Sequence, residues 1–159
     1  MTAGAAWTRA SLVLVVVLVL DQVTKALARN GIDRGSEDPV FPFLKLVHVR
    51  NEGVAFGIAA GGRTLVIVLI SVALLALVLY FARHAATPLI WLPTGLLIGG
   101  AVGNIVDRIR DGAVTDFLKI PAWPAFNVAD VAIVFGVIAL VFVLETKEKG
   151  EEKPDASPT

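Results

Sequence analysis

The stretch ASLVLVVVLVLDQVTKALA, residues 10–28, is an apolar run that ends in charged residues. A transmembrane helix needs about 20 predominantly apolar residues to cross the hydrocarbon core of a bilayer. The stretch has that length, and Asp21 and Lys25 fall in its last two turns. Residues four apart share one face of a helix, so these two side chains are placed to form an ion pair. The stretch therefore predicts a membrane span with a charged end.

Three further segments match the same pattern, at residues 64–81, 88–105 and 127–144. Hydrophobic residues make up 56% of the 159 residues, and the mean hydropathy is +0.77. Soluble domains are about 45–50% apolar and interrupt their apolar runs with polar faces. We therefore expect an α-helical integral membrane protein with four transmembrane helices. The formal net charge of zero gives no reason to expect a nucleic-acid partner.

The first span has an alternative interpretation. Arg9, the apolar run and the small residues Ala26 and Ala28 together imitate a cleaved signal peptide. Asp21 and Lys25 would lie awkwardly just before such a cleavage point, and three more spans follow. We favour a retained transmembrane helix.

The polar loop at residues 30–63 contains VFPFLKLVHVRNEGVAFGI, residues 40–58. Its Val, Phe and Leu residues, bounded by Gly and Pro, are typical of strands, so we expect a small β-sheet between spans one and two at the membrane surface. The last stretch, TKEKGEEKPDASPT, residues 146–159, is charged and contains proline. We expect one membrane domain over residues 1–145 and a disordered tail over 146–159.

Four spans place both termini on one side of the membrane, and the polar residues at the span ends then collect on the opposite side. These residues are Asp21, Lys25, Asn104, Asp107, Arg108, Asn127 and Asp130, together with the loop 30–63. Ionisable residues near a bilayer usually face a bundle interior or a cavity, so this side is the candidate site. A count of the loop arginines and lysines alone would place it in the cytoplasm.

Asp116 and Asp130 are the candidate catalytic pair. Asp116 lies in an apolar, strand-like segment, and Pro121 and Pro124 interrupt the connection that follows it. This connection is long enough to fold back and bring the two carboxyl groups together. Two close carboxylates cannot both ionise, so they share a proton; the charged one takes a proton from water while the protonated one donates to a scissile carbonyl. The pair therefore predicts aspartic-protease chemistry.

Simpler structural roles exist for each of these residues. Asp116 suits a turn, and Asp130 in the first turn of a helix capped by Asn127 complements the helix dipole. Asp21 and Lys25 suit a structural ion pair, and Arg108 suits anchoring at the membrane interface. The glycines of GGAVG, residues 99–103, are typical of close helix packing.

Other chemistries find little support. The chain has no cysteine, and His48 and His84 lie far apart in sequence, so we expect no metal and no cofactor. Asn104 lies one turn before Arg108 and shares its face, which suits binding of a substrate's peptide carbonyls. A small four-span transporter is the alternative function, but it would need an acidic residue near the middle of a span. A structural assembly factor is a third possibility.

Four motifs, in order, resemble the lipoprotein signal peptidases of bacteria, the signal peptidase II family. They are DQVTKALA at 21–28, RNEGVAFGI at 50–58, GGAVGNIVDRIRDGAVTDF at 99–117 and FNVADVAI at 126–133. The resemblance implies that Asp116 and Asp130 are catalytic and that Asp21, Lys25 and Asp107 support them. It also implies that the site is lined by Asn51, Asn104, Arg108 and Asn127.

The resemblance further implies a function and a location. The family cleaves prolipoproteins just before a cysteine that carries a diacylglyceryl group, so the expected partners are this lipidated substrate and membrane lipids. It implies a monomer in the bacterial cytoplasmic (inner) membrane, with both termini in the cytoplasm and the site on the extracytoplasmic face, against the charge count. Residues 40–60 would form the extracytoplasmic sheet and a loop over the substrate cleft. The connection between the two aspartates is shorter than is typical of the family.

Overall fold

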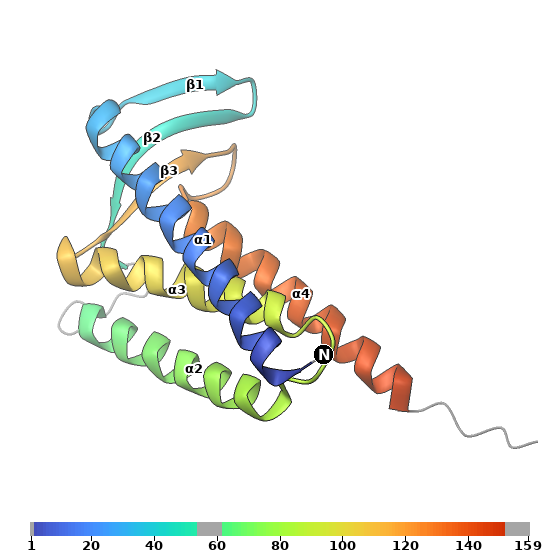
Figure 1. Cartoon of the computed structure of the whole chain (residues 1–159). Coiled ribbons are helices and arrows are strands. Elements are labelled where there is room, and N and C mark those ends of the chain that lie inside the picture. Colours follow the sequence, from blue (N-terminus) through green and yellow to red (C-terminus); the bar gives the residue numbers. More distant parts are fainter. Residues whose placement is uncertain (1, 54–61, 152–159) are drawn as a thin grey trace, which may run out of the picture.

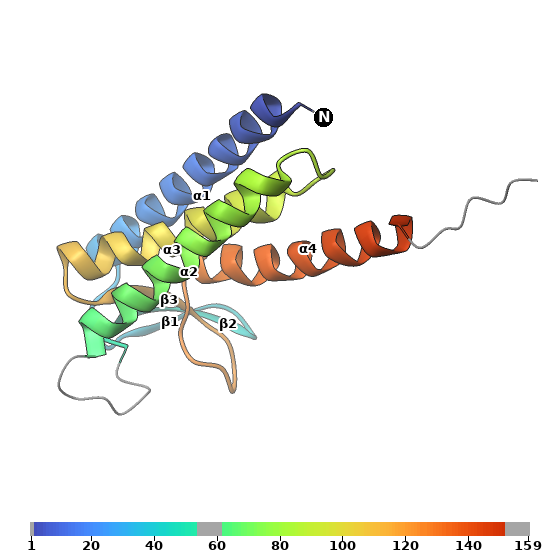
Figure 2. The same cartoon turned by 90° about the horizontal axis from the view of Figure 1, so that it is seen from below.

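A computed structural model of the chain describes residues 2–53 and 62–151. The elements are α1 (Ala3–Gly31), β1 (Glu37–Phe41), β2 (Leu44–Asn51), α2 (Gly62–His84), α3 (Trp91–Arg110), β3 (Val114–Lys119) and α4 (Val128–Glu151). The helices form a bundle with the small sheet at one end, while the N-terminus and the far end of α4 lie at the other end (Figures 1 and 2). The expected helical fold, with one helix at each predicted span, is confirmed.

The helices differ in how they meet the membrane. In the described part of the chain, three helices are long and apolar enough to cross a bilayer, at Ala3–Gly31, Thr64–His84 and Val128–Lys147. Large apolar side chains such as Val16, Leu69 and Phe135 are exposed on their outer faces. Contiguous exposed apolar surface is rare on soluble proteins, so these faces are suited to contact lipid. Helix α3 packs mainly between α1 and α4.

Glycines let α3 approach its neighbours closely, as the GGAVG motif predicts. A Cβ atom at Gly99 would lie 2.9 Å from Cβ of Val17 in α1. One at Gly100 would lie 2.5 Å from the carbonyl oxygen of Ala129 in α4, and one at Gly103 would lie 2.5 Å from Oδ2 of Asp21. Small residues permit such close backbone contact between membrane helices. The glycine face therefore sets the distance between the helices that carry the site.

Replacement of Gly100 by alanine is expected to lower the apparent unfolding temperature of the purified protein. The new methyl group would overlap backbone at Ala129, and overpacking of this kind costs about 1–3 kcal/mol. Circular dichroism in detergent measures the effect. Gly4→Ala is the matched control, because a Cβ at Gly4 in α1 meets nothing within 4 Å. Equal unfolding temperatures for the two variants would contradict the packing argument.

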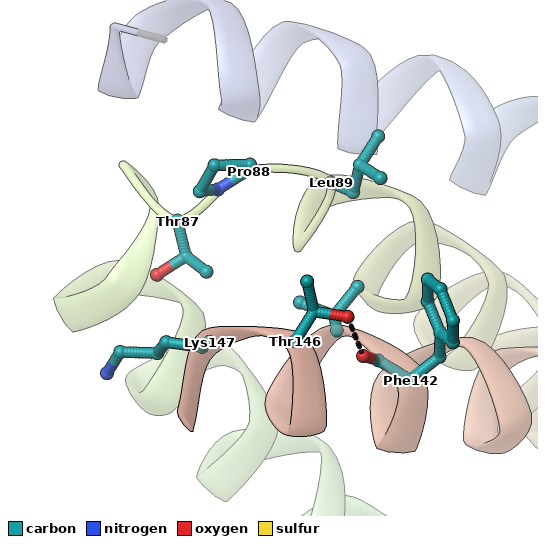
Figure 3. Close-up of a pocket in the computed structure, with 7 residues that line it drawn as sticks. Thr87, Pro88, Leu89, Phe142, Thr146 and Lys147 are labelled. Carbon is teal, nitrogen blue, oxygen red and sulfur yellow. Dashed lines mark hydrogen bonds between the residues drawn. The ribbon is translucent and has the colours of Figure 1, made fainter. Parts of the chain in front are cut away.

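The end of the bundle near the termini is held by apolar packing. Phe81 of α2 and Ile90 before α3 are buried, and the Phe81 ring meets Trp7 edge-on, with ring centroids 4.6 Å apart. Beside this core, a largely apolar hollow of about 160 Å³ lies between the α2–α3 connection and α4 (Figure 3). In it, the Thr146 hydroxyl donates a hydrogen bond to the carbonyl of Phe142 (Figure 3). Its lining contains no carboxylate, so the candidate catalytic residues lie elsewhere.

The sheet has the order β1-β2-β3, and both pairs are antiparallel. The expected strands between the first two helices are confirmed as β1 and β2. The third strand comes from the connection between α3 and α4, and it places Val49 of β2 opposite Asp116 of β3. The sheet therefore brings the loop after α1 next to one of the two candidate aspartates.

Two expectations fall partly outside the described residues. The predicted covering loop over residues 40–60 includes residues 54–60, which are not described. Of the predicted tail over 146–159, residues 146–151 continue α4 and residues 152–159 are not described.

Candidate active site

The connection after β3 folds back on the strand, as its length predicted. The backbone N–H groups of Phe117 and Leu118 donate to the carbonyl of Phe126 at 3.0 and 2.9 Å, and Phe126 N–H donates back to Leu118 at 2.9 Å. This return places Asn127, the residue before α4, beside Asp116. The Asn127 side-chain amide donates to Oδ1 of Asp116 at 2.7 Å.

Asn127 also caps α4 and holds Asp130. Its Oδ1 accepts from the Asp130 backbone N–H at 3.0 Å, and Oδ2 of Asp130 accepts from the Asn127 N–H at 3.2 Å. This reciprocal pair is arranged as in a capping box, so Asp130 also has the simpler structural role of capping the start of α4. The same fully buried asparagine binds the carboxyl groups of both Asp116 and Asp130. The structure thus brings the two candidate aspartates together.

Asn104 of α3 fixes the second carboxyl group from the other side. Its side-chain nitrogen donates to Oδ1 of Asp130 at 2.8 Å. Its Oδ1 accepts from Nζ of Lys25 at 2.9 Å and from the Asn127 amide at 3.3 Å. These partners allow only one orientation of the Asn104 amide. Lys25 is therefore linked to Asp130 through one buried side chain.

Asn51 completes the surroundings of Asp116. Its side-chain nitrogen donates to Oδ2 of Asp116 at 2.9 Å, so each oxygen of this carboxyl group accepts one amide hydrogen bond. An open cavity of about 430 Å³ lies on this side, and its lining includes Val49, Asn51, Asp116 and Pro124. Asp116 itself is only 2% exposed. The carboxyl group is thus buried at the wall of a cavity that opens to solvent.

Burial raises the pKa of Asp116 to about 6. The hydrogen bond from Asn51 opposes this shift, and the negative charge of Asp130 adds to it. The hydrogen bond from Asn127 and the charge of Lys25 lower the pKa by smaller amounts. The protonated form of Asp116 is therefore populated near pH 6, beside a second carboxyl group.

A buried ion cluster lies behind the pair. Nζ of Lys25 is 2.9 Å from a carboxyl oxygen of Asp21 and 3.2 Å from one of Asp107, and all three side chains are fully buried. The predicted Asp21–Lys25 pair is confirmed, and Asp107 joins it. Buried charges are tolerated only when they are paired and hydrogen-bonded.

The two acids of this cluster hold the strands and helices of the site. Asp21 Oδ1 accepts from the backbone N–H of Ala129 in α4 at 2.9 Å. Asp107 Oδ2 accepts from the backbone N–H of Thr115 in β3 at 3.1 Å. Ala129 precedes Asp130 and Thr115 precedes Asp116. The cluster is therefore placed to position both candidate aspartates through the backbone.

Gln22 belongs to this cluster, although no sequence pattern singled it out as a site residue. Its side-chain nitrogen lies 3.0 Å from Asp21 Oδ2, 3.1 Å from Asp107 Oδ1 and 3.2 Å from the Gly103 carbonyl, and it donates to all three. The one available signal was its place inside the DQVTK motif. An uncharged residue next to a charged pair gives no indication of long-range contacts.

Arg108 lies at the exit of α3 and is half-buried. One of its nitrogens donates to the carbonyl of Asn104 at 3.2 Å, and its charge interacts with those of Asp130 and Asp116. Its guanidinium therefore contributes positive potential to the site. A residue that only anchored the helix at the membrane interface would not need to lie this close to the two acids. Among the described residues, no group of three or more His, Cys, Asp or Glu side chains is arranged to hold a metal ion.

These features define a polytopic membrane protein in which two acids are hydrogen-bonded to one asparagine, at the end of the helix bundle remote from the termini. A family model described as signal peptidase (SPase) II matches residues 13–145. The chain therefore belongs to the signal peptidase II family. This membership supports the peptidase interpretation over the four-span transporter and the assembly factor.

Individual relatives agree with the family. A protein of Halothermothrix orenii named lipoprotein signal peptidase is 39% identical over 87% of this chain and 96% of its own length. One of Rhodopseudomonas palustris with the same name is 42% identical over 80% of this chain and 86% of its own.

Solved structures share the fold. Two chains, both described as bacterial membrane enzyme structures, superpose with TM-scores of 0.81 and 0.83 at 34% and 32% identity. The first alignment covers 85% of this chain and 91% of the solved one, and the second covers 94% of each.

Proposed function

We propose that this chain is an aspartic endopeptidase that removes the signal peptide from lipid-modified prolipoproteins. Its family and the names of its relatives support the substrate class. The observation that carries the aspartic mechanism is the single buried asparagine, Asn127, that binds the carboxyl groups of both Asp116 and Asp130. Two acids held this way share one proton and need no metal to activate water.

The proposed reaction begins with the proton on the buried Asp116 and with Asp130 ionised. Asp130 takes a proton from a water molecule, and the oxygen of that water bonds to the scissile carbonyl carbon. At the same time Asp116 gives its proton to the carbonyl oxygen. In the resulting diol, Asp130 returns its proton to the peptide nitrogen, and Asp116 takes a proton from one hydroxyl as the carbon–nitrogen bond breaks. Both carboxyl groups then regain their starting states.

The neighbours have separate proposed roles. Both polar ends of the Asn104 amide are committed to buried partners, so we assign this residue to orienting Asp130 rather than to binding substrate. Arg108 keeps most of its donors free of the protein within the described residues, which suits binding of peptide carbonyls. Asn51 borders the cavity beside Asp116 and lines the substrate path. Asp21, Lys25 and Asp107 position the backbone of the site.

We infer that the site faces the extracytoplasmic side of the bacterial cytoplasmic membrane, with both termini in the cytoplasm. The substrate's diacylglyceryl group stays in the lipid, so the scissile bond is held at the membrane–water boundary. In support, Asp116 in β3 and Asp130 in the first turn of α4 lie at the end of the helix bundle remote from the termini. The charge count argues otherwise, but the charge of Arg108 interacts with those of the two candidate aspartates, and the long loop is a weak topology signal. A monomeric catalytic unit over residues 1–145, with 146–159 as an appended tail, completes the proposal.

Cleavage of a diacylglyceryl-modified precursor beside its unlipidated twin tests this function. We expect kcat/KM to be at least about 100-fold higher for the lipidated precursor, because the anchor replaces diffusion in three dimensions with delivery at the depth of the site. Mass spectrometry of the released peptides identifies the cleaved bond. Equal cleavage of both precursors would contradict the boundary-positioning argument.

The raised pKa of Asp116 predicts the pH dependence of the reaction. The reaction requires the protonated form of Asp116, which determines the basic limb of the pH profile. On this limb kcat/KM should be constant below about pH 6 and should fall as pH rises through about 6. Substrate binding removes water from the cavity and disfavours the carboxylate further, so the corresponding limb of kcat should lie at higher pH. Initial rates in detergent micelles between pH 4.5 and 9 measure both limbs. A kcat/KM that rises from pH 6 to pH 8 would contradict the assignment of the proton to Asp116.

A further inference from the structure

A second polar cavity, of about 180 Å³, lies beside the strand pair β2–β3. Its lining consists of Arg29, Arg34, His48, Arg50, Asp111, Ala113 and Thr115, and we call it the arginine pocket. Three arginines converge there from the end of α1, the loop after it and β2. The proposed peptidase chemistry uses none of them.

The strand geometry separates the arginine pocket from the catalytic side. Side chains alternate between the two faces of a strand. Asn51 and Asp116, which are hydrogen-bonded to each other, occupy one face. Their neighbours Arg50 and Thr115, directly opposite each other in the register, line the arginine pocket. The pocket therefore opens mainly on the other face of the strands, and Arg50 borders both this pocket and the cavity beside Asp116.

The arginines of this pocket have hydrogen-bond donors that lack an acceptor among the described residues. A guanidinium offers about five N–H donors in a fork that matches the oxygens of a phosphate. Arg29 donates to the Thr115 hydroxyl at 3.2 Å, and Arg50 donates to the backbone carbonyl of Asp111. Within residues 2–53 and 62–151, Arg34 makes no hydrogen bond or ion pair.

The lining also has an excess of positive charge, with three arginines against Asp111. Asp111 is paired mainly with Arg110, at 2.7 Å, which is not part of the lining. The pKa of Asp111 is lowered chiefly by its hydrogen bond from Arg110, and the charges of Arg29 and Arg50 add to this effect. The acids nearest the pocket arginines lie at long ion-pair distances: Asp111 and Asp107 are each 3.9 Å from Arg29, and exposed Glu52 is 3.7 Å from Arg50. The field in the cavity therefore favours an anion.

The depth of the pocket indicates which anion is available. Leu27 and Val23, two and six residues before Arg29 on α1, are 66% and 51% exposed, and Ile109 beside Arg110 is 68% exposed. These apolar side chains are suited to contact acyl chains. The arginine pocket lies just beyond them, at the level of the headgroups, where phospholipid phosphates are concentrated. Basic residues at this level attract anionic headgroups.

We propose that the arginine pocket binds the phosphate of an anionic phospholipid, with the acyl chains of that lipid lying in the bilayer beside the exposed apolar residues of α1 and α3. The lipid would then hold the sheet at the membrane surface on the side opposite Asp116. Arg29 and Arg50 form forked contacts to the phosphate, and Arg34 closes the pocket from the loop.

Titration of the full-length protein in detergent with phosphatidylglycerol, read out by native mass spectrometry, tests the proposal. We expect Arg34→Gln and Arg50→Gln each to weaken the binding of this lipid about fivefold, the effect of one basic residue near a headgroup. Lys45→Gln is the matched control, because it removes the same charge from an exposed position of β2 that pairs with Glu37. It should change binding less than about twofold. Circular dichroism confirms that each variant is folded.

Three outcomes would overturn the proposal. Equal weakening by Arg34→Gln and Lys45→Gln would mean that diffuse surface charge, and not the pocket, attracts the lipid. Equal affinity for phosphatidylcholine and phosphatidylglycerol would remove the preference for an anionic headgroup. Displacement of phosphatidylglycerol by an equal concentration of inorganic phosphate would show a site for free anions rather than for lipid.

Discussion

Asp116→Asn and Asp130→Asn are each expected to lower kcat/KM for a lipidated precursor by at least about 1,000-fold, within the range for loss of an acid–base catalyst. An amide can neither hold the shared proton nor accept one from water. Each replacement keeps the size of the side chain, and Asn51, Asn104 and Asn127 remain in place around it. The loss should therefore appear in catalysis and not in folding. Cleavage rates and circular dichroism on the same preparations measure the two effects.

Asp38→Asn is the matched control for these variants. Asp38 is exposed in β1, on the same side of the bundle, and removal of its charge should leave kcat/KM unchanged. Full activity of either Asp116→Asn or Asp130→Asn would end the aspartic mechanism. A parallel loss of activity and of helical structure would instead indicate that the residue supports the fold.

Lys25→Met is expected to produce the largest loss of stability, about 3–5 kcal/mol, because it leaves Asp21 and Asp107 buried without their central cation. Arg29, with a nitrogen 3.9 Å from Asp107, compensates only weakly. The hydrogen bond from Lys25 to Asn104 is lost as well, so activity should fall together with stability. The apparent unfolding temperature in detergent measures the change.

Lys45→Met provides the comparison. The Lys45–Glu37 pair is exposed, and pairs of this kind contribute at most about 1 kcal/mol. The triple variant Asp21→Asn, Lys25→Met, Asp107→Asn should recover part of the stability, since it removes the unpaired charges. If Lys25→Met unfolds at the same temperature as Lys45→Met, the buried cluster does not hold the site together.

The sequence allowed prediction of features that depend on local patterns. Apolar runs of membrane length predicted the helices, and the four-residue spacing of Asp21 and Lys25 predicted their ion pair. Span topology predicted that the polar residues at the span ends would lie on one side of the membrane. The length of the connection after Asp116 predicted its return toward Asp130, and the Phe117–Phe126 hydrogen bond confirms that return.

Contacts that depend on tertiary register were not predictable in this way. Asn51 was a candidate only by resemblance, because 65 residues separate it from Asp116 and only the pairing of β2 with β3 joins them. The link from Asp107 to the Thr115 backbone and the three contacts of Gln22 depend on how α1 and α3 pack. No periodicity in one segment encodes a partner in another.

The central claim is that Asp116 and Asp130 hold one proton between them. The most direct measurement is a pH titration of the carboxyl carbons by ¹³C NMR on protein labelled in aspartate, with Asp116→Asn used to assign the signal. We predict that the Asp116 carboxyl group titrates near pH 6 and that its apparent pKa falls in Asp130→Asn, where the neighbouring charge is removed. Titration of Asp116 near pH 4, unaffected by the change at residue 130, would contradict a shared proton.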